Sequence, residues 1–386
     1  MSNIVIVGGG FAALQTIKML RKADQNITIT ITMVTADSGV EYSKPNLSHV
    51  FSNEQTPQQL VMNNAQQLAK QYNVVIKTNV WVNEINTEQQ FIVAGDDVIP
   101  YSKLVLATGA TPFIPPAEGL LPQATITLNS LEEFERSKAQ IDDAQRITVI
   151  GGGLIGVELA FDLQTAGKDV TIIEPASYLL NSLVPPFVSL ELGRELTKAG
   201  VTVETDSAVC RATYLPDGVR LQTTSSRLIK TDVVIAAAGL MPNTTLAKQA
   251  GIEVNRGIIV NEAMRTSIQN VYAIGDCTEI QGQVMAYLQP AVLSASILAK
   301  QLTTGEGKLR LPHIITKVKT PRYPIQLAGR NIQTVQSWEA RFDPKGIIAK
   351  GFNESNQLVG FIVTGEHTQS AFSLLKELQI SSPPHA

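Results

Sequence analysis

The chain has 386 residues, enough for about two or three domains that each bury a core, and its formal net charge of −3 argues against a general nucleic-acid binder. It has no apolar run near the roughly 18 residues that a transmembrane helix needs, and its N-terminus lacks the basic and apolar regions of a signal peptide. Because Cys210 and Cys277 match neither a disulfide framework nor a zinc site, we expect a cytoplasmic protein that binds neither nucleic acid nor membrane.

The chain opens with a pattern typical of a dinucleotide-binding βαβ unit. Residues 3–7 form a short apolar strand, a helix is predicted over 11–22, and a second strand over 27–34. Three small residues with the spacing G-x-G-x-x-A join the first strand to the helix: Gly8, Gly10 and Ala13. No acid ends the second strand, so either the hydroxyl of Thr35 or the carboxylate of Asp37 is expected to replace the usual ribose-binding acid.

The segment up to residue 112 contains a polar turn and a second strand end of interest. Pro45 forces Lys44 out of helical geometry, and that lysine is either a solvated charge or a ligand contact. A helix is predicted over 57–72 and a pair of strands over 74–93. A buried strand then delivers three residues to a turn, which is either an ordinary strand end or a place where the backbone faces a ligand: Ala107, Thr108 and Gly109.

A second and more complete dinucleotide pattern begins at residue 147. The strand 147–150 leads into three glycines with the spacing G-x-G-x-x-G: Gly151, Gly153 and Gly156. An apolar helix follows and stops near Gly167, and the strand 169–173 ends in Glu174, close to the 20 or so residues expected between the first glycine and a ribose-binding acid. Glycines of this kind let the backbone approach a pyrophosphate at a helix N-terminus. The alternative is a packing turn in an unrelated α/β protein.

The remaining chain repeats this organisation and then changes character. Prolines from 112 to 122 mark the entry into the second nucleotide domain, which includes a helix over 188–199 and closes with a buried strand, Gly239 and Pro242. A further strand, 271–274, leads to Gly275 and Asp276, before a helix over 291–302. The tail has three alternating strands and a helix, predicted over 333–341, 346–353, 358–364 and 367–378.

These elements predict an α/β protein with two Rossmann-like dinucleotide-binding domains and a small α+β C-terminal domain. We expect a discontinuous first domain from residues 1–113 and 243–320. The second nucleotide domain is predicted to span 114–242, and the small domain 321–386.

The order of the motifs resembles that of the two-dinucleotide-domain flavoproteins, or pyridine nucleotide-disulfide oxidoreductases. The resemblance covers residues 1 to about 300 and consists of G-x-G-x-x-A, A-T-G, G-x-G-x-x-G with its acid, A-x-G-x-x-P-N and Y-A-I-G-D. It implies that the first glycine motif binds FAD and the second binds NAD(P)H. It also implies that Asp276 holds the ribityl chain of FAD.

The segments 42–48 and 318–321 resemble rubredoxin reductases within that family. The segments 182–186, 282–284 and 289–290 are similar to the NADH:flavorubredoxin reductases of bacterial nitric oxide detoxification. This likeness implies an NADH-dependent enzyme whose acceptor is rubredoxin or the rubredoxin domain of a flavorubredoxin. It also places five residues at the flavin: Lys44, Val82, Glu158, Leu288 and Lys319. One departure is His49, which stands where ferredoxin reductases of the family usually carry a lysine.

Taken together, the motifs and the resemblance predict cofactor contacts for FAD and NAD along most of the chain, and no metal site. In the first nucleotide domain these are Gly8, Gly10, Phe11, Ala12, Ala13, Thr35, Lys44, Pro45, Val82, Ala107, Thr108, Gly109, Gly275, Asp276 and Leu288. In the second they are Gly151, Gly153, Leu154, Ile155, Gly156, Glu158, Glu174 and Gly239, to which Lys319 is added. Glu174 also predicts a preference for NADH over NADPH, because its charge repels a 2′-phosphate.

The cysteines bear on the chemistry. Disulfide reductases and NADH oxidases of the family carry redox cysteines after the first helix, and residues 38–60 contain none. Cys277 is expected to be small buried packing and not a redox centre. The flavin is then the single redox group, and no side-chain acid, base or nucleophile is expected. The alternatives left open are a ferredoxin reductase and a non-enzymatic signalling protein that responds to NADH.

The segment from Gly307 to Trp338 has no acidic residue in a chain that is slightly acidic as a whole. It carries six cations: Lys308, Arg310, Lys317, Lys319, Arg322 and Arg330. Since the resemblance implies an acidic rubredoxin as partner, we expect this segment to steer the carrier electrostatically. The alternative is that some of these charges are simply solvated.

Overall fold

The computed structural model describes residues 3–329 and 332–382. The chain forms two compact units. Unit 1 comprises Met1–Lys44, Gln58–Thr111 and Leu240–Leu311, and unit 2 comprises Pro45–Pro57, Pro112–Gly239 and Pro312–Ala386. No helix within the described ranges is long and apolar enough to cross a membrane.

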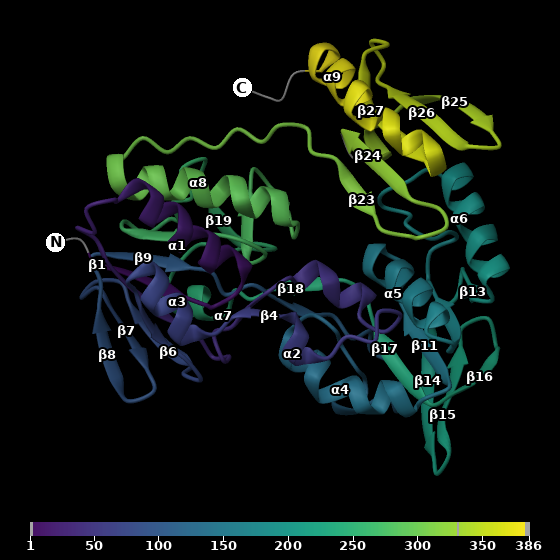
Figure 1. The fold of residues 1–386 in the computed structure, drawn as a ribbon, viewed down its shortest axis with the longest axis horizontal. Coiled ribbons are helices and arrows are strands. Elements are labelled where there is room, and N and C mark those ends of the chain that lie inside the picture. The colour runs from purple at the N-terminus through teal and green to yellow at the C-terminus, as the bar shows by residue number, and fades with distance from the viewer. Residues whose placement is uncertain (1–2, 330–331, 383–386) are drawn as a thin grey trace. The chain divides into compact units, whose positions relative to one another are not determined.

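Unit 1 is built on a five-stranded parallel sheet with the order β20-β9-β1-β2-β5. Its strands are β1 (Asn3–Val7), β2 (Thr30–Val34), β5 (Val75–Lys77), β9 (Lys103–Leu106) and β20 (Val271–Ala273). Strands buried on both faces are read from continuous apolar runs, as in β1, where Ile4, Val5 and Ile6 are fully buried. The helices α1 (Phe11–Ala23) and α8 (Leu288–Thr304) lie side by side in Figure 1 and share this core.

Smaller elements complete unit 1. The antiparallel sheet of β6 (Val82–Asn86), β7 (Phe91–Ala94) and β8 (Asp97–Pro100) follows β5 in the chain. The other short elements of this part of the chain are β3 (Glu41–Tyr42), β4 (Val61–Asn63), α3 (Ala65–Tyr72), β10 (Ala110–Pro112), β18 (Leu240–Pro242), α7 (Thr245–Gln249), β19 (Ile258–Val260), β21 (Thr278–Ile280) and β22 (Gln283–Val284).

The single helix predicted over 57–72 is wrong. The chain instead forms α2 (Pro57–Leu60), the strand β4 and then α3. The break occurs because Asn64 is a strong N-cap: its side chain accepts a hydrogen bond from the Gln67 amide, and the Gln67 side chain accepts one from the Asn64 amide. This reciprocal capping box starts a new helix and ends the old one.

Unit 2 contains the second Rossmann-like sheet, with the order β13-β12-β11-β17 and parallel pairing throughout. Its strands are β11 (Arg146–Ile150), β12 (Asp169–Ile173), β13 (Thr202–Glu204) and β17 (Val233–Ala236). Its helices are α4 (Leu131–Asp143), α5 (Leu154–Thr165) and α6 (Pro186–Ala199). An antiparallel sheet of β14 (Val209–Leu215), β15 (Gly218–Thr223) and β16 (Leu228–Thr231) precedes β17. The helix expected over 188–199 is thus confirmed, with Pro186 in its first turn.

The C-terminal part of unit 2 is a five-stranded antiparallel sheet with the order β23-β24-β27-β26-β25. Its strands are β23 (Thr316–Val318), β24 (Ile325–Gly329), β25 (Ser337–Asp343), β26 (Gly346–Phe352) and β27 (Leu358–Thr364). The helix α9 (Ala371–Ser381) packs on β27, as Figure 1 shows, with Leu374 and Leu378 against Phe361 and Val363. The first two strands were not predicted, because each is short and carries polar residues.

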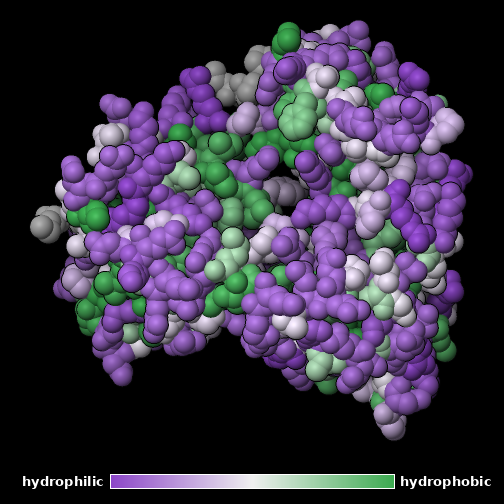
Figure 2. Space-filling view, in the orientation of Figure 1, coloured by the Kyte–Doolittle hydropathy of each residue, from purple (hydrophilic) through white to green (hydrophobic). Residues whose placement is uncertain are grey.

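The architecture confirms the predicted α/β class with two Rossmann-like sheets and a small C-terminal domain. The three-domain boundaries stay a prediction. Hydrophilic residues cover most of the face in Figure 2, and the hydrophobic ones there form separate patches.

Candidate dinucleotide-binding sites

The first glycine turn (residues 8–13) links β1 to α1 and leaves the helix N-terminus open. Gly8 has a φ of +113°, and a Cβ there would come within 2.2 Å of the Ala107 carbonyl oxygen, so a larger residue does not fit. Gly10 is the N-cap of α1, and a Cβ on it would meet nothing within 4 Å. Backbone amides at an uncrowded helix N-terminus attract anions, so this turn fits the pyrophosphate of a dinucleotide.

The carboxylate of Asp37 stands at the carboxyl end of β2. Thr35 is buried, and its hydroxyl donates a 2.7 Å hydrogen bond to Asp37 Oδ1, which also accepts one of 2.9 Å from the Gly39 amide. Of the two expected substitutes for the missing acid, Thr35 therefore orients and Asp37 supplies the carboxylate. A Cβ on Gly9 would lie 2.6 Å from Thr35 Oγ1, which brings this pair against the glycine turn.

The other predicted residues of unit 1 gather partly around the start of α1. Gly275 has a φ of +83°, and a Cβ there would lie 2.7 Å from the Ala12 side chain, so the turn that carries Asp276 packs on α1. Lys44 Nζ lies 3.7 Å from Asp276 Oδ2, so Lys44 is paired and not merely solvated. Thr108 donates a 2.8 Å hydrogen bond to the Asn243 carbonyl.

Three predicted residues of unit 1 have plainer positions. Phe11 is the first residue of α1 and Leu288 the first of α8. Val82 begins β6, and its side chain packs against the core of the unit. Gly109, with a φ of +66°, has open space where a Cβ would lie, as expected for backbone that faces a ligand.

The second glycine turn (residues 151–156) repeats the geometry in unit 2. Gly151 has a φ of +111°, and a Cβ on it would lie 2.5 Å from the Ala237 carbonyl oxygen. Gly153 is the N-cap of α5 and has open space around its Cβ position. A Cβ on Gly156 would lie 1.9 Å from the Gly151 carbonyl oxygen, so the helix can pack this closely on the turn only with glycine. The turn therefore fits a second pyrophosphate.

Glu174 is held directly against this turn. Its Oε2 accepts a 2.6 Å hydrogen bond from the Gly152 amide, and its Oε1 accepts one of 2.8 Å from Ala176. Leu154 and Ile155 form the first turn of α5, and Ile155 is half exposed. Gly239, at a φ of +110°, ends the strand β17 and has open space around its Cβ position.

Three further predicted residues of unit 2 meet around the carboxylate of Glu158, which is 2% exposed. Its Oε1 accepts a 2.7 Å hydrogen bond from the Lys319 amide, and its Oε2 accepts one of 2.7 Å from the Ser48 hydroxyl. The Lys319 ammonium donates a 3.2 Å hydrogen bond to the Pro45 carbonyl. Glu158 thus joins two segments that are remote in sequence.

Sequence reasoning missed Asp162, one helical turn beyond Glu158 on α5. Its carboxylate is buried and accepts hydrogen bonds from the Phe51 amide (2.9 Å), the Ser52 amide (3.2 Å) and the Ser52 hydroxyl. Burial raises the pKa of Asp162 above its ordinary value. The available signal was a pair of acids at i and i+4 in a helix that is otherwise almost wholly apolar.

The cysteines have no redox partner in the described chain, since both are free. Cys277 is fully buried, and its Sγ donates weak hydrogen bonds to the carbonyls of Ile274 (3.3 Å) and Leu106 (3.6 Å). Burial raises the pKa of this thiol, which disfavours the reactive thiolate. Cys210 is exposed on β14 in the other unit.

The basic segment is only partly free of partners. Lys308 pairs with Glu262 at 3.3 Å, and Lys319 is committed to Pro45. Lys317 and Arg322 are exposed and form no ion pair with any residue that the structure describes, and the same holds for Arg310 in unit 1. Arg330 lies outside the described residues.

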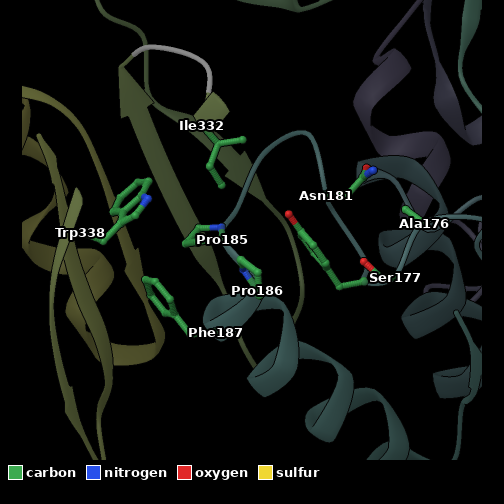
Figure 3. Close-up of a pocket in the computed structure, with 9 residues that line it drawn as sticks. Ala176, Ser177, Asn181, Pro185, Pro186, Phe187, Ile332 and Trp338 are labelled. Atoms are coloured by element: carbon green, nitrogen blue, oxygen red, sulfur yellow. The ribbon is translucent and has the colours of Figure 1, made fainter. Parts of the chain in front are cut away.

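A pocket of about 610 Å³ opens beside the turn that follows Glu174. Figure 3 shows its walls, which come from the loop before α6, the start of α6, and the C-terminal sheet: Ala176, Ser177, Tyr178, Asn181, Pro185, Pro186, Phe187, Ile332 and Trp338. The rings of Phe187 and Trp338 meet edge to face with centroids 6.3 Å apart. This contact joins α6 to β25 and was not predicted, because the two aromatic residues are remote in sequence.

Comparison with known proteins agrees with this geometry. Residues 2–295 match the family model described as pyridine nucleotide-disulphide oxidoreductase, and residues 308–378 match the model described as rubredoxin binding C-terminal domain.

Two curated relatives carry the name nitric oxide reductase FlRd-NAD(+) reductase. The one from Aliivibrio fischeri (strain ATCC 700601 / ES114) is 45% identical, over 98% of this chain and 99% of its own. The one from Klebsiella pneumoniae (strain 342) is 43% identical, over 97% and 99%. A solved structure of the covalent putidaredoxin reductase–putidaredoxin complex superposes with a TM-score of 0.88 at 25% identity, over 98% of this chain and 93% of its own. The chain belongs to the pyridine nucleotide-disulphide oxidoreductase family.

Proposed function

We propose that this chain is an FAD-dependent NADH:rubredoxin oxidoreductase whose acceptor is rubredoxin or the rubredoxin domain of a flavorubredoxin, in support of nitric oxide reduction. The observation that carries the proposal is the match of residues 308–378 to a rubredoxin-binding domain, joined to two glycine turns that each fit a dinucleotide. The printed names of the relatives, which cover nearly all of this chain, support the same acceptor.

FAD is assigned to unit 1. The first glycine turn offers backbone amides to the pyrophosphate, and Asp37 lies where a ribose hydroxyl would be recognised. Asp276, on a turn that packs against α1, is available for the ribityl hydroxyls, and Lys44 balances its charge. Bound FAD would supply the step between a two-electron donor and one-electron acceptors.

NADH is assigned to the second glycine turn in unit 2. The amides at the start of α5 face its pyrophosphate, and Glu174, fixed by two backbone amides, accepts the ribose hydroxyls. The residues after Glu174 are Pro175, Ala176 and Ser177, which supply no cation for a 2′-phosphate. Glu174 is therefore the residue that selects NADH.

No thiol is required in this scheme. Cys277 is buried with a raised pKa, and Cys210 lies exposed on a β-strand of the other unit. We therefore expect the variant Cys210→Ala with Cys277→Ser to retain electron transfer from NADH. A collapse of turnover with unchanged flavin content and melting temperature would contradict a mechanism that uses the flavin alone.

The carrier is steered by Lys317 and Arg322. These two exposed cations lie in the rubredoxin-binding match and have no ion pair among the described residues, unlike Lys308, which Glu262 neutralises. Unpaired surface charges of one sign raise the association rate of an acidic partner more than its final affinity. The variant Lys317→Glu with Arg322→Glu should slow rubredoxin reduction at low salt and flatten its dependence on ionic strength.

Stopped-flow mixing tests the whole proposal. NADH should bleach the flavin absorbance, and a rubredoxin should restore it faster than a ferredoxin does at equal concentration. Ferricyanide reports hydride entry without carrier docking, so the Lys317/Arg322 double variant should leave it unchanged, and the control Arg341→Glu with Lys376→Glu should leave both acceptors unchanged. If the ferredoxin were reduced faster than every rubredoxin, the acceptor assignment would be wrong.

A further inference from the structure

Residues 45–57 belong to unit 2 although the chain on both sides of them belongs to unit 1. This 45–57 segment is attached to α5 by two carboxylates. Glu158 binds the Ser48 hydroxyl, and Asp162 binds the amides of Phe51 and Ser52 together with the Ser52 hydroxyl. The attachment therefore depends on two buried acids on one face of one helix.

Those two acids are poorly compensated. Glu158 and Asp162 are 2% and 3% exposed, and they are spaced i, i+4, so their charges repel across one turn. Burial disfavours the charged form of each, although the hydrogen bonds that they accept offset part of this cost. Within the described ranges neither has a lysine or arginine partner, and the one ion pair of Glu158 is with His49.

His49 is in an unusual position for a histidine. Its Nε2 is buried, has no hydrogen-bond partner among the described residues, and lies 3.8 Å from Glu158 Oε2. A buried ring nitrogen without a partner is costly, and one next to a carboxylate is satisfied when it carries a proton. The proton would turn a contact just beyond hydrogen-bond length into a charge-assisted one.

The groups around His49 come from several elements. Helix α5 supplies Glu158 and Asp162, and the segment after β23 supplies Lys319, whose ammonium is bound to the Pro45 carbonyl. Helix α4 contributes the neutral ring of Phe134, which packs on Phe51 with centroids 5.7 Å apart. Two acids and one engaged cation thus surround one titratable ring.

We propose that His49 is a proton-dependent attachment point of the 45–57 segment: protonated, it pairs with Glu158 and holds the segment on α5, and neutral, it leaves two buried carboxylates without a cation and the segment loosens. The sign is the same for Asp162, whose pKa is raised by burial. A group of that kind stabilises the folded state below its ordinary pKa and loses this contribution as pH rises through the raised value. The segment should therefore be most firmly held at low pH.

The inference concerns attachment of a segment and does not depend on which carrier accepts electrons. It is tested on the holoprotein by amide hydrogen exchange of Phe51, Ser52 and Lys319, after correction for the intrinsic rise of exchange with pH. Protection of these amides should fall about fivefold between pH 5.5 and pH 8, across the ordinary titration range of histidine, as for the loss of an ion pair worth about 1 kcal/mol. Protection that stays flat over this range would overturn the proposal.

Three variants give the result its specificity. His49→Lys keeps a positive charge at every pH in the range and should show high, pH-independent protection, whereas His49→Gln should show low protection throughout. Glu158→Gln still accepts hydrogen bonds but carries no charge, so it should abolish the pH dependence. His367→Gln removes an imidazole that pairs with Asp343 in the C-terminal sheet, and it should leave the profile of the segment unchanged.

If the His49 variants did not fold, the wild-type and Glu158→Gln profiles would decide the matter, since the proposal requires that they differ. A pH profile in His49→Gln equal to that of wild type would also overturn it. Rubredoxin reduction is measured separately, so a failure of the proposed electron transfer and a failure of this attachment are distinct results.

Discussion

The two glycine turns have nearly the same backbone but differ in two side chains. Gly8 and Gly151 share a positive φ and the same close approach to a carbonyl of the neighbouring strand end, Ala107 or Ala237. Gly10 and Gly153 are both N-caps with open space around them. The shared features are those that the pyrophosphate demands of the backbone, and side chains cannot replace them.

The differences lie where side chains set the detail. The third small residue is Ala13 in the first turn and Gly156 in the second, where a Cβ would collide with the Gly151 carbonyl oxygen. The acid is Asp37, oriented by Thr35, in one case and Glu174, bound by two amides, in the other. A carboxylate can therefore reach the end of the second strand by two routes, and only one of them places it directly after the strand.

The first strands of the two sheets are also anchored differently. The amide of Asn3 in β1 donates a 2.7 Å hydrogen bond to the Ser102 hydroxyl, a neutral contact. Arg146 in β11 instead pairs with Asp232, which also accepts hydrogen bonds from the amides of Arg146 (2.7 Å) and Gln145 (3.0 Å). The anchor of the second sheet is thus charged and sensitive to pH, and that of the first is not.

The largest expected effect distinguishes the two turns by ligand. Gly8→Ala and Gly151→Ala each add a Cβ that overlaps a carbonyl oxygen at positive φ, which should cost about 4 kcal/mol. Gly8→Ala should be purified without flavin. Gly151→Ala should retain flavin and lose NADH binding, as measured by flavin absorbance and by NADH titration. Loss of flavin in both variants would break the assignment of the two turns.

A smaller effect should separate the third positions. Gly156→Ala is expected to lower the free energy of unfolding by about 3 kcal/mol through overpacking, whereas Ala13→Gly should cost about 1 kcal/mol through helix propensity. Chemical denaturation measures both. Equal costs would mean that the close packing at Gly156 relaxes without strain.

Glu174 sharpens the comparison of the acids. A phosphate charge about 5 Å from a carboxylate costs about 3 kcal/mol at an effective dielectric of about 20, so wild type should prefer NADH by about a hundredfold in kcat/KM. Glu174→Gln should reduce that preference at least about tenfold, or about 1.4 kcal/mol. Asp37→Asn is the matched control, and it should weaken flavin binding with the preference unchanged. Equal kcat/KM of wild type for both nucleotides would remove Glu174 from its role.

The smallest effect concerns pH. Hydrogen bonding to Arg146 lowers the pKa of Asp232 from 3.8 to about 2. A lowered pKa stabilises the folded state above the unfolded value, and that contribution is lost as pH falls from about 3.8 towards 2. Asp232→Asn should therefore make acid unfolding less steep in this window, while Ser102→Ala should not change its slope. An unchanged slope in Asp232→Asn would show that the pair does not couple to unfolding.

Much of the fold follows from local pattern. Apolar runs of four or five residues predicted the parallel strands β1 and β11, and the glycine spacings predicted where the helices begin, because both depend on neighbours in sequence. Where local signals competed, the prediction over 57–72 failed, since the capping box of Asn64 and Gln67 was stronger than the helical periodicity around it. The short polar strands β23 and β24 gave no periodic signal at all.

By itself, the sequence determined the α/β class, the two glycine turns, the acid of the second turn and the absence of a cysteine between residues 38 and 60. Tertiary structure alone decided that Asp37 and not Thr35 supplies the first carboxylate, and that Glu158 and Asp162 hold the 45–57 segment beside His49. Those contacts join residues 110 and 111 positions apart. A hydrogen bond across such a distance leaves no trace in local periodicity, because it depends on how separate elements pack and not on which residues are neighbours in the chain.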